Sequence, residues 1–275
     1  MDKDLIKIYH KAPLTALKPF VKKISIFESE GRISFTQKLT PSPYNYISYN
    51  QKDIPVSLLN KRVITPKSRL MIAGIKTEKI YVKYEGVLLQ ILFEFTASGF
   101  YYLFHQSPVN YMNSLAEPNK IFSSQEMTKL ANNLSGTVDV NKQIISIENL
   151  LLSKISGSKI PNLYLEKSID LIEKNHGMIQ IKDIADQVEV CERQLNRKFK
   201  EVVGISPKKF SKILQLHYLI YLIQHKKLPI QEIVFKGSFY DRPHLTHTFK
   251  DLTGMTPVEF INSSNHVAFE YFTSL

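Results

Sequence analysis

Two stretches of the chain, about fifty residues apart, share the same landmarks. The first reads CERQLNRKFKEVVGISP from Cys191, and the second reads GSFYDRPHLTHTFKDLTGMTP from Gly237 to Pro257. Five positions of the first copy return 50 residues later: Phe199, Lys200, Gly204, Pro207 and Phe210 recur as Phe249, Lys250, Gly254, Pro257 and Phe260. A constant spacing over so many positions predicts that one structural unit is built twice.

Each copy is expected to form a short helix, a tight turn and a second helix. In the second helix, Leu195 and Phe199 stand four residues apart, which places both on one buried face. Leu245 and Phe249 repeat this spacing. A long apolar helix joins the copies, with Ser206 as its N-cap and Pro207 as its first residue. The pattern is typical of a helix-turn-helix, and two such units on one stiff helix suit successive major grooves about 10 bp apart.

The side chains left outward on these second helices are of the types that contact base edges and phosphates. They are Arg193, Asn196, Arg197 and Lys200 in the first copy, and Arg242, Thr246, His247 and Lys250 in the second. Lys208 and Lys209 follow in the first turn of the long helix and suit phosphates. The net charge of +11 favours a nucleic-acid partner. Most of the basic excess lies before residue 162, however, and a solvated charged face is the alternative for any one run.

With these landmarks, residues 163–262 resemble the DNA-binding domain of the AraC/XylS family of bacterial transcription regulators. The family motif of the second unit, I-A-x-x-x-G-F-x-D-x-x-H-F-x-x-x-F-K-x-x-x-G-x-x-P-x-x-F, falls here on Ile233, Val234, Ser238, Phe239, Asp241, His244, Leu245, Phe249, Lys250, Gly254, Pro257 and Phe260. The resemblance implies double-stranded DNA as the partner and allows contact with RNA polymerase. It places the base-facing positions on Arg193, Asn196, Arg197, Arg242, Pro243, Thr246 and His247.

The two turns depart from the family pattern, because Glu189 and Ser238 stand where the family has glycine. Glycine adopts a positive φ without steric cost. We therefore expect strain or a changed turn at Glu189, and we expect Gly237 to compensate for Ser238. Gln215, Leu219 and His247 also differ from the residues common in the family. These differences motivate an alternative function, a sensor or partner-binding protein with weakened DNA affinity that acts through protein contacts.

The first half of the chain has a different character. From about Lys23 to Phe104 it is rich in aromatic and β-branched residues, which predicts a barrel or sandwich, with strands broken at Gly86. Residues 1–23 are expected to be a basic tail. The segment LLQILFEFTASGFYYLF resembles β-rich N-terminal domains of some family members, which implies a small-molecule effector or a homodimer. Tyr44, Tyr46 and Tyr49 are the candidate ligand-binding residues, with ordinary strand packing as the alternative.

Helices are expected again over residues 123–156. Ile144, Ile147, Leu151 and Ile155 form one apolar stripe, which fits either packing within the chain or a dimer seam. The fold class is therefore α+β: a barrel-like or sandwich-like β domain, a helical linker, and an all-α domain of two helix-turn-helix units. The predicted boundaries are 1–122 for the β-rich sensor or dimerisation domain, 123–160 for the helical linker, 161–262 for the DNA-binding domain and 263–275 for a C-terminal tail.

Several functional classes are disfavoured. Only His10 and His105 precede residue 161, too few for a metal-dependent enzyme of the cupin type, and no phosphate loop or nucleophile–base pair occurs. The sequence therefore predicts no catalytic residue, metal or cofactor, and a regulator rather than an enzyme. The single Cys191 excludes an internal disulfide and indicates a reducing compartment, the cytoplasm. The longest apolar run is far too short for a membrane span.

Overall fold

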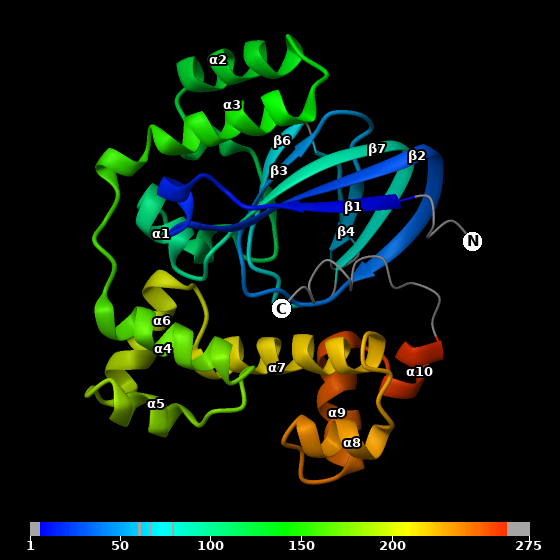
Figure 1. The fold of residues 1–275 in the computed structure, drawn as a ribbon, viewed down its shortest axis with the longest axis vertical. Coiled ribbons are helices and arrows are strands. Elements are labelled where there is room, and N and C mark those ends of the chain that lie inside the picture. The colour runs from blue at the N-terminus through cyan, green and yellow to red at the C-terminus, as the bar shows by residue number, and fades with distance from the viewer. Residues whose placement is uncertain (1–5, 60–61, 67, 79, 263–275) are drawn as a thin grey trace.

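The computed structural model describes residues 6–59, 62–66, 68–78 and 80–262, so the expected tail at 263–275 lies outside the described residues. A curved antiparallel sheet forms the N-terminal part, and a helical region forms the C-terminal part. Figure 1 shows helices α2 and α3 at one end of the sheet and helices α4 to α10 at the other. This is the α+β architecture that the sequence predicts.

Strand β7 (Ile80–Phe95) is the centre of the sheet. It pairs along its length with β2 (Val21–Leu39), from Phe95 opposite Val21 to Ile80 opposite Leu39. The expected break at Gly86 is wrong, because this residue adopts a φ of +109° and the strand continues through it. The carboxylate of Asp53 occupies the space where a Cβ of residue 86 would stand, and it accepts a hydrogen bond from the Val87 amide at 2.8 Å. Only glycine fits this bend.

The remaining strands close around β7. One half of β7 pairs with β3 (Tyr46–Asn50) and the other half with β4 (Val56–Leu59), so the sheet divides along its length. The outer pairs are β3 with β6 (Leu70–Ala73), β6 with β8 (Leu115–Ala116), β4 with β5 (Arg62–Ile64), and β2 with β1 (Ile6–Lys11). The prediction of a basic N-terminal tail is wrong for Ile6–Lys11. These residues form strand β1, which pairs antiparallel with β2 at the edge of the sheet.

Helices α1 (Gly99–Phe104), α2 (Ser124–Ser135) and α3 (Val140–Leu152) follow the sheet. Ser123 caps α2 in a reciprocal capping box with Glu126, and Asp139 caps α3. Ile144, Ile147 and Leu151 are buried in the protein's own core. The apolar stripe is therefore used for packing within the chain, and the prediction that it is a dimer seam is wrong.

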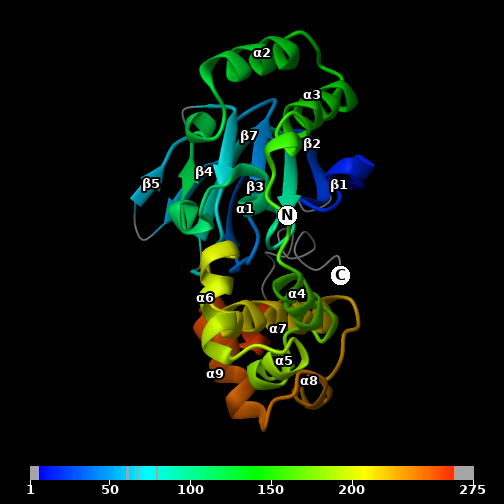
Figure 2. The same ribbon diagram turned by 90° about the vertical axis from the view of Figure 1, so that its left-hand side faces the viewer.

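The C-terminal region consists of α4 (Leu163–Lys174), α5 (Ile181–Gln187), α6 (Glu192–Val202), α7 (Pro207–Gln224), α8 (Ile230–Lys236), α9 (Arg242–Thr253) and α10 (Pro257–Asn262). Ser206 caps α7 by accepting a hydrogen bond from the Lys209 amide at 3.2 Å, with Pro207 at the first position as expected. Figure 2 shows α7 running beneath the sheet, between it and the lower helices. None of the helices in the described part of the chain has the length and apolarity of a membrane span.

Two apolar clusters hold the described residues together. The larger one runs from the sheet through α1 to α3 into α4, α5, α6 and the first half of α7, ending at Leu214. The smaller one begins at Leu216 and contains the second half of α7, α8, α9 and Phe260 of α10. The boundary between the clusters therefore falls inside α7.

Candidate nucleic-acid interface

The two predicted units are present, and their second helices match residue by residue. We call α5 with α6 unit 1 and α8 with α9 unit 2. Residues 191–200 and 241–250 have the same succession of buried, half-buried and exposed side chains. Leu195, Phe199, Leu245 and Phe249 are all fully buried. The 50-residue offset in the sequence is thus an offset in structure, and each unit presents an equivalent outer face.

In the turn of each unit, a residue other than glycine adopts the backbone conformation that glycine would have there. Glu189 has a φ of +56° and Ser238 a φ of +55°, so both residues adopt the left-handed conformation themselves. The expected compensation by Gly237 is wrong, since its φ is −84°. A Cβ at Gly237 would instead lie 2.6 Å from a methyl carbon of Leu219 on α7. This glycine therefore permits close packing of unit 2 on α7.

Unit 2 also has one more residue in its turn than unit 1. One residue separates Glu189 from the N-cap Cys191, whereas Phe239 and Tyr240 separate Ser238 from the N-cap Asp241. The Asp241 carboxylate accepts a hydrogen bond from the His244 amide at 2.7 Å. Cys191 makes no such bond through its side chain. The start of α9 is therefore fixed by a side-chain cap that α6 lacks.

The predicted DNA-contact side chains lie mostly on the surface. Exposed are Arg193, Arg197, Lys200, Lys208, Arg242, Pro243, His247 and Lys250, and half-buried are Asn196, Lys209 and Thr246. The guanidinium groups of Arg193, Arg197 and Arg242 make no hydrogen bond or ion pair within the described part of the chain. Nδ1 of His247 lies 3.3 Å from the Asp251 carboxylate one turn later on α9. Arg193 and Arg197 of α6 therefore have fewer competing contacts than His247.

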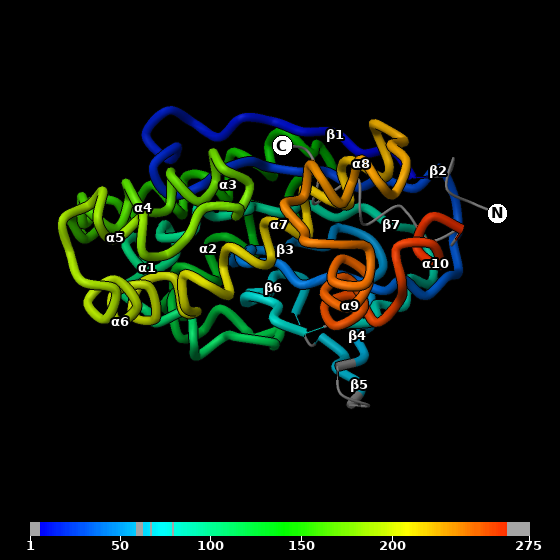
Figure 3. The backbone as a smooth tube through the Cα atoms, turned by 90° about the horizontal axis from the view of Figure 1, so that it is seen from below, coloured from blue at the N-terminus to red at the C-terminus, as the bar shows by residue number. Residues whose placement is uncertain are grey.

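Helix α7 sets the relation between the units, which lie at its opposite ends (Figure 3). The Gln215 side chain, at a position where the sequence departs from the family, donates a hydrogen bond to the Gly237 carbonyl at 2.7 Å. This bond ties the turn of unit 2 to the middle of α7.

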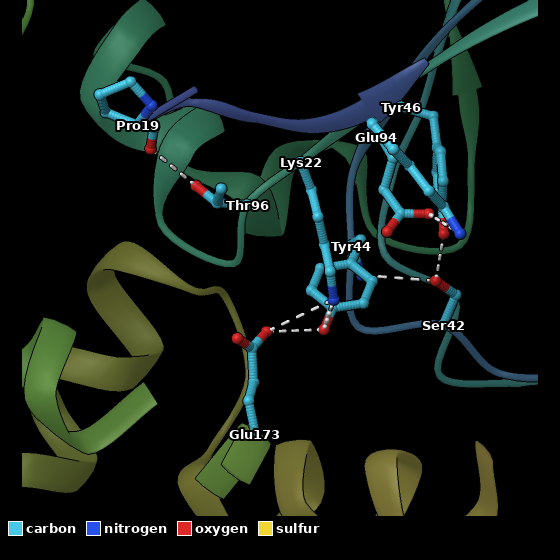
Figure 4. A network of polar contacts seen from close by, with 9 residues as sticks. Pro19, Lys22, Ser42, Tyr44, Tyr46, Glu94, Thr96 and Glu173 are labelled. Carbon is cyan, nitrogen blue, oxygen red and sulfur yellow. Dashed lines mark hydrogen bonds and ion pairs between the residues drawn. The ribbon is translucent and has the colours of Figure 1, made fainter. Parts of the chain in front are cut away.

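Unit 1 and α4 are joined to the sheet through a polar network that the sequence analysis missed. The Tyr44 hydroxyl donates to Glu173 of α4 at 2.7 Å and accepts from Lys22 at 3.0 Å (Figure 4). At the far end of unit 1, the Tyr101 hydroxyl of α1 donates to Glu201 of α6 at 2.8 Å. Tyr44 and Glu173 are 129 residues apart in the chain, and Tyr101 and Glu201 are 100 apart, so no local spacing could have predicted these two contacts.

Several ionisable groups are buried beside this network. Burial raises the pKa of Glu94, and the Lys23 ammonium, 3.9 Å away, opposes that rise. Burial lowers the pKa of Lys76 to about 8, although the Glu94 carboxylate acts in the opposite direction. Burial also lowers the pKa of His217 to about 4, and its Nε2 donates to the Pro41 carbonyl at 2.8 Å. The middle of α7 is thereby bonded to the loop before β3.

The three candidate ligand-binding tyrosines do not share one pocket. Tyr44 belongs to the network with Glu173, while Tyr46 lines an apolar cavity of about 120 Å³ inside the curved sheet. Tyr49 lines a separate groove on the other face of β3. The alternation of side chains along a strand separates them. Within the described residues, no group of three or more His, Cys, Asp or Glu side chains is arranged to hold a metal ion.

Comparison with known proteins identifies the helical region. The family described as "Helix-turn-helix domain" matches residues 184–263. The transcriptional activator RhaR of Enterobacter sp. is 26% identical over 88 residues, 32% of this chain and 31% of that protein. RhaR of Salmonella arizonae is 32% identical over 80 residues, 29% of this chain and 28% of that protein. The matched segment therefore spans less than a third of these relatives.

Two solved structures are also similar to this chain, one over most of its length and one over about a third of it. ToxT from Vibrio cholerae is 9% identical, with 93% of this chain and 97% of that chain covered and a TM-score of 0.48. A regulator from Chromobacterium violaceum with an AraC-type DNA-binding domain is 32% identical, with 35% of this chain and 88% of that chain covered and a TM-score of 0.33. Given the family match and the two units described above, the C-terminal part of this chain is a helix-turn-helix domain of the AraC type.

Proposed function

We propose that the protein is a sequence-specific DNA-binding transcription regulator of the AraC type. The observation that carries this proposal is the duplicated exposed face of α6 and α9, with unpaired arginines at equivalent ends of two units held by one helix. A helix of this kind presents its first turns to base edges in the major groove. The protein acts by binding rather than by catalysis, in the cytoplasm where the DNA is.

Individual roles follow from side-chain chemistry. Arg193, Asn196 and Arg197 of unit 1, and Arg242, Pro243, Thr246 and His247 of unit 2, are proposed to face the bases. Lys200, Lys208, Lys209 and Lys250 are proposed to contact phosphates, which position the protein without reading sequence. The domain boundaries at 122, 160 and 262 remain part of this proposal.

The test is DNA binding by the full chain. Genome-wide footprinting supplies a cognate site, and fluorescence anisotropy then measures the affinity for that site and for a scrambled duplex at several salt concentrations. We expect the logarithm of the binding constant to fall linearly with the logarithm of the salt concentration. The double variant Arg197→Ala/Arg242→Ala should lose preference for the cognate site, while Lys83→Ala on β7 should leave it unchanged. Absence of salt-dependent binding to any DNA would refute the proposal.

We also propose that the cavity inside the sheet is the effector site. It is lined by apolar residues of β2, β6 and β7, including Phe27, Met71 and Leu88, together with Lys76. The buried Asn50 Oδ1 has no hydrogen-bond partner. A cavity of about 120 Å³ approaches the roughly 150 Å³ of apolar cavities that bind benzene. The cavity suits a small, largely apolar molecule with one hydrogen-bond donor for Asn50.

Thermal unfolding in the presence of such small molecules tests this site. A molecule that binds there should raise the unfolding temperature of the natural chain and have no effect on Ala73→Phe, which fills the cavity. An equal shift in both proteins would show that the molecule binds elsewhere. Homodimerisation and contact with RNA polymerase remain predictions; a dimer would use a surface other than the buried stripe on α3.

A further inference from the structure

A second site lies on the opposite face of the sheet from the effector cavity. We call it the α2 groove: a depression of about 470 Å³ between α2, the start of α3 and the adjoining ends of β3 and β6. Figure 1 shows α2 and α3 at this end of the sheet. Along β6, Met71 lines the cavity and Leu70 lines the groove, as the alternation of strand side chains requires. The two sites share no lining residue.

The floor of the α2 groove is apolar. Leu70 from the sheet and Leu130 and Leu134 from α2 are buried, and Met127 lies beside them. The volume of about 470 Å³ falls within the range of roughly 300–1,000 Å³ typical of small-molecule sites. The groove can therefore cover the apolar body of a ligand that is larger than the sheet cavity admits.

One edge of the groove is cationic and fixed in place. Nη1 of Arg69 donates to three successive carbonyls, those of Asn50 at 3.1 Å, Gln51 at 2.7 Å and Lys52 at 2.6 Å. The other N–H groups of Arg69 have no partner in the described part of the chain. Lys52 adds a second, exposed cation on the same edge. A guanidinium that its own backbone already orients is well prepared to bind an acidic group.

The wall of the groove contains one buried polar atom without a partner. Tyr49 also lines the groove, and its hydroxyl makes no hydrogen bond within the described residues. Gln143 is fully buried; its Nε2 donates to the Thr137 carbonyl at 2.9 Å, but its Oε1 has no partner. Buried polar atoms are normally hydrogen-bonded, so the unpartnered Gln143 Oε1 in the wall of a groove points to a ligand that supplies a donor to it.

We propose that the α2 groove binds a small amphipathic anion. Its apolar body lies on Leu70, Leu130 and Leu134, and its acidic group lies at Arg69 and Lys52. A hydroxyl or amine on the ligand contacts Tyr49 or Gln143. This site is independent of DNA binding and of the effector cavity, and it stands whether or not either proposal holds.

The test uses 8-anilinonaphthalene-1-sulfonate, which combines an aromatic body, an amine and a sulfonate. The full chain is titrated with this probe and, in parallel, with N-phenyl-1-naphthylamine, the same body without the sulfonate. We expect saturable binding of one sulfonate probe per chain and at least tenfold weaker binding of the uncharged probe. The chain contains no tryptophan, so a tryptophan introduced for the test is the only one present.

Variants then locate the bound probe. Ala131→Trp places a large ring in the groove from an exposed position of α2, and Asn133→Trp places the same ring on α2 at a residue that does not line the groove. Ala131→Trp should weaken binding of the sulfonate at least tenfold, and Asn133→Trp should not. Lys52→Glu should weaken the sulfonate about fivefold without affecting the uncharged probe, whereas the matched control Lys83→Glu should have no effect.

Near-ultraviolet circular dichroism of each variant separates loss of the site from loss of the fold. If Ala131→Trp does not fold, Lys52→Glu still decides the outcome. The proposal is overturned if the natural chain does not bind the sulfonate, or if neither variant weakens it. It is also overturned if sedimentation shows that a second copy of the chain displaces the probe as protein concentration rises.

Discussion

Unit 1 and unit 2 have the same helices and the same buried residues, yet they have different neighbours. The apolar residues of unit 1 belong to the large cluster that includes the sheet, whereas those of unit 2 belong to a small cluster with α7 and α10. Gly204, just after α6, shows how closely unit 1 packs against the N-terminal part of the chain. A Cβ at this residue would lie 3.0 Å from Pro108 and 3.2 Å from Ile75. A repeated sequence thus specifies the local fold, while its position in the chain determines what that fold is attached to.

The turns add a second difference. Unit 2 exposes two aromatic side chains beside its longer turn, Phe235 at 85% and Tyr240 at 93% exposure. The matching position of Phe235 in unit 1 is the acidic Asp186, and Tyr240 has no counterpart. Because the apolar cluster of unit 1 includes the sheet, the sheet can influence unit 1 directly. Unit 2 shares its cluster with α7 and depends on that helix for its position.

The largest test of this comparison removes one buried ring from each unit. Phe199→Ala and Phe249→Ala should each destabilise their own cluster by about 3–5 kcal/mol. Because the clusters are separate, Phe249→Ala should lower hydrogen-exchange protection only in the second half of α7 and in α8–α10, while Phe199→Ala should lower it in α4–α6, the first half of α7 and the sheet together. Hydrogen exchange read by mass spectrometry distinguishes these patterns. Equal loss of protection in the sheet for both variants would contradict the two-cluster description.

The sequence predicted what depends on local spacing. The offset between Phe199 and Phe249 implied the second unit, its buried face and its outer residues, because helix periodicity relates sequence directly to surface. Contacts between distant segments followed no such rule. The phenol of Tyr44 makes this residue a candidate for ligand binding, but nothing near it in the sequence indicates Glu173, 129 residues away. The spacing of three residues between Tyr46 and Tyr49 places them on opposite faces of a strand, but it could not show what lies on each face.

The contact at the middle of α7 gives a pH-dependent test. Burial holds the pKa of His217 at about 4, below its ordinary 6.5, so the unfolded chain binds the extra proton first. The neutral, buried His217 therefore contributes its full stabilisation of the fold above about pH 6.5. As the pH falls towards 4, the free energy of unfolding decreases by on the order of 3 kcal/mol in total. Urea unfolding between pH 4 and 7 should therefore show a shallower pH dependence for His217→Gln than for the natural chain.

The matched control for that experiment is His247→Gln, in an exposed position of α9. It leaves the buried His217 and its bond to Pro41 in place, so this variant should keep the pH dependence that His217 gives to the natural chain. Burial also raises the pKa of Glu94, so the difference between the natural chain and each variant is the informative quantity. If His217→Gln and the natural chain lose stability in parallel as the pH falls, the bond to Pro41 does not connect α7 to the sheet in solution.

DNA binding by single variants gives a further test of the difference between unit 1 and unit 2. Arg197→Ala should weaken binding to the cognate site by about 1–3 kcal/mol and relax the preference at one base position, as expected for loss of a bidentate arginine–guanine pair. His247→Ala should have a smaller effect, because its ring already lies 3.3 Å from the Asp251 carboxylate. Anisotropy on cognate and scrambled duplexes separates the cases. Equal losses on both duplexes for Arg197→Ala would show that this residue positions the protein and does not read sequence.

The smallest expected effect tests whether the network at Tyr44 stabilises the attachment of the helical region to the sheet. Glu173→Gln keeps the shape of the side chain but removes the charge that Tyr44 and Lys22 contact. Because the Glu173 side chain is 35% exposed, solvent screens much of this interaction, and a loss of about 0.5–1 kcal/mol is expected. Asp251→Asn is the matched change in unit 2, where the partner His247 lies on the same helix. It should alter the free energy of unfolding by less than about 0.5 kcal/mol.

Calorimetry on both variants measures these changes, and hydrogen exchange shows where they act. Loss of protection confined to α4 and the β2–β3 region in Glu173→Gln would locate the attachment at this network. Unchanged protection there would mean that apolar packing alone joins the helices to the sheet, and that the polar contacts at Tyr44 are incidental to it.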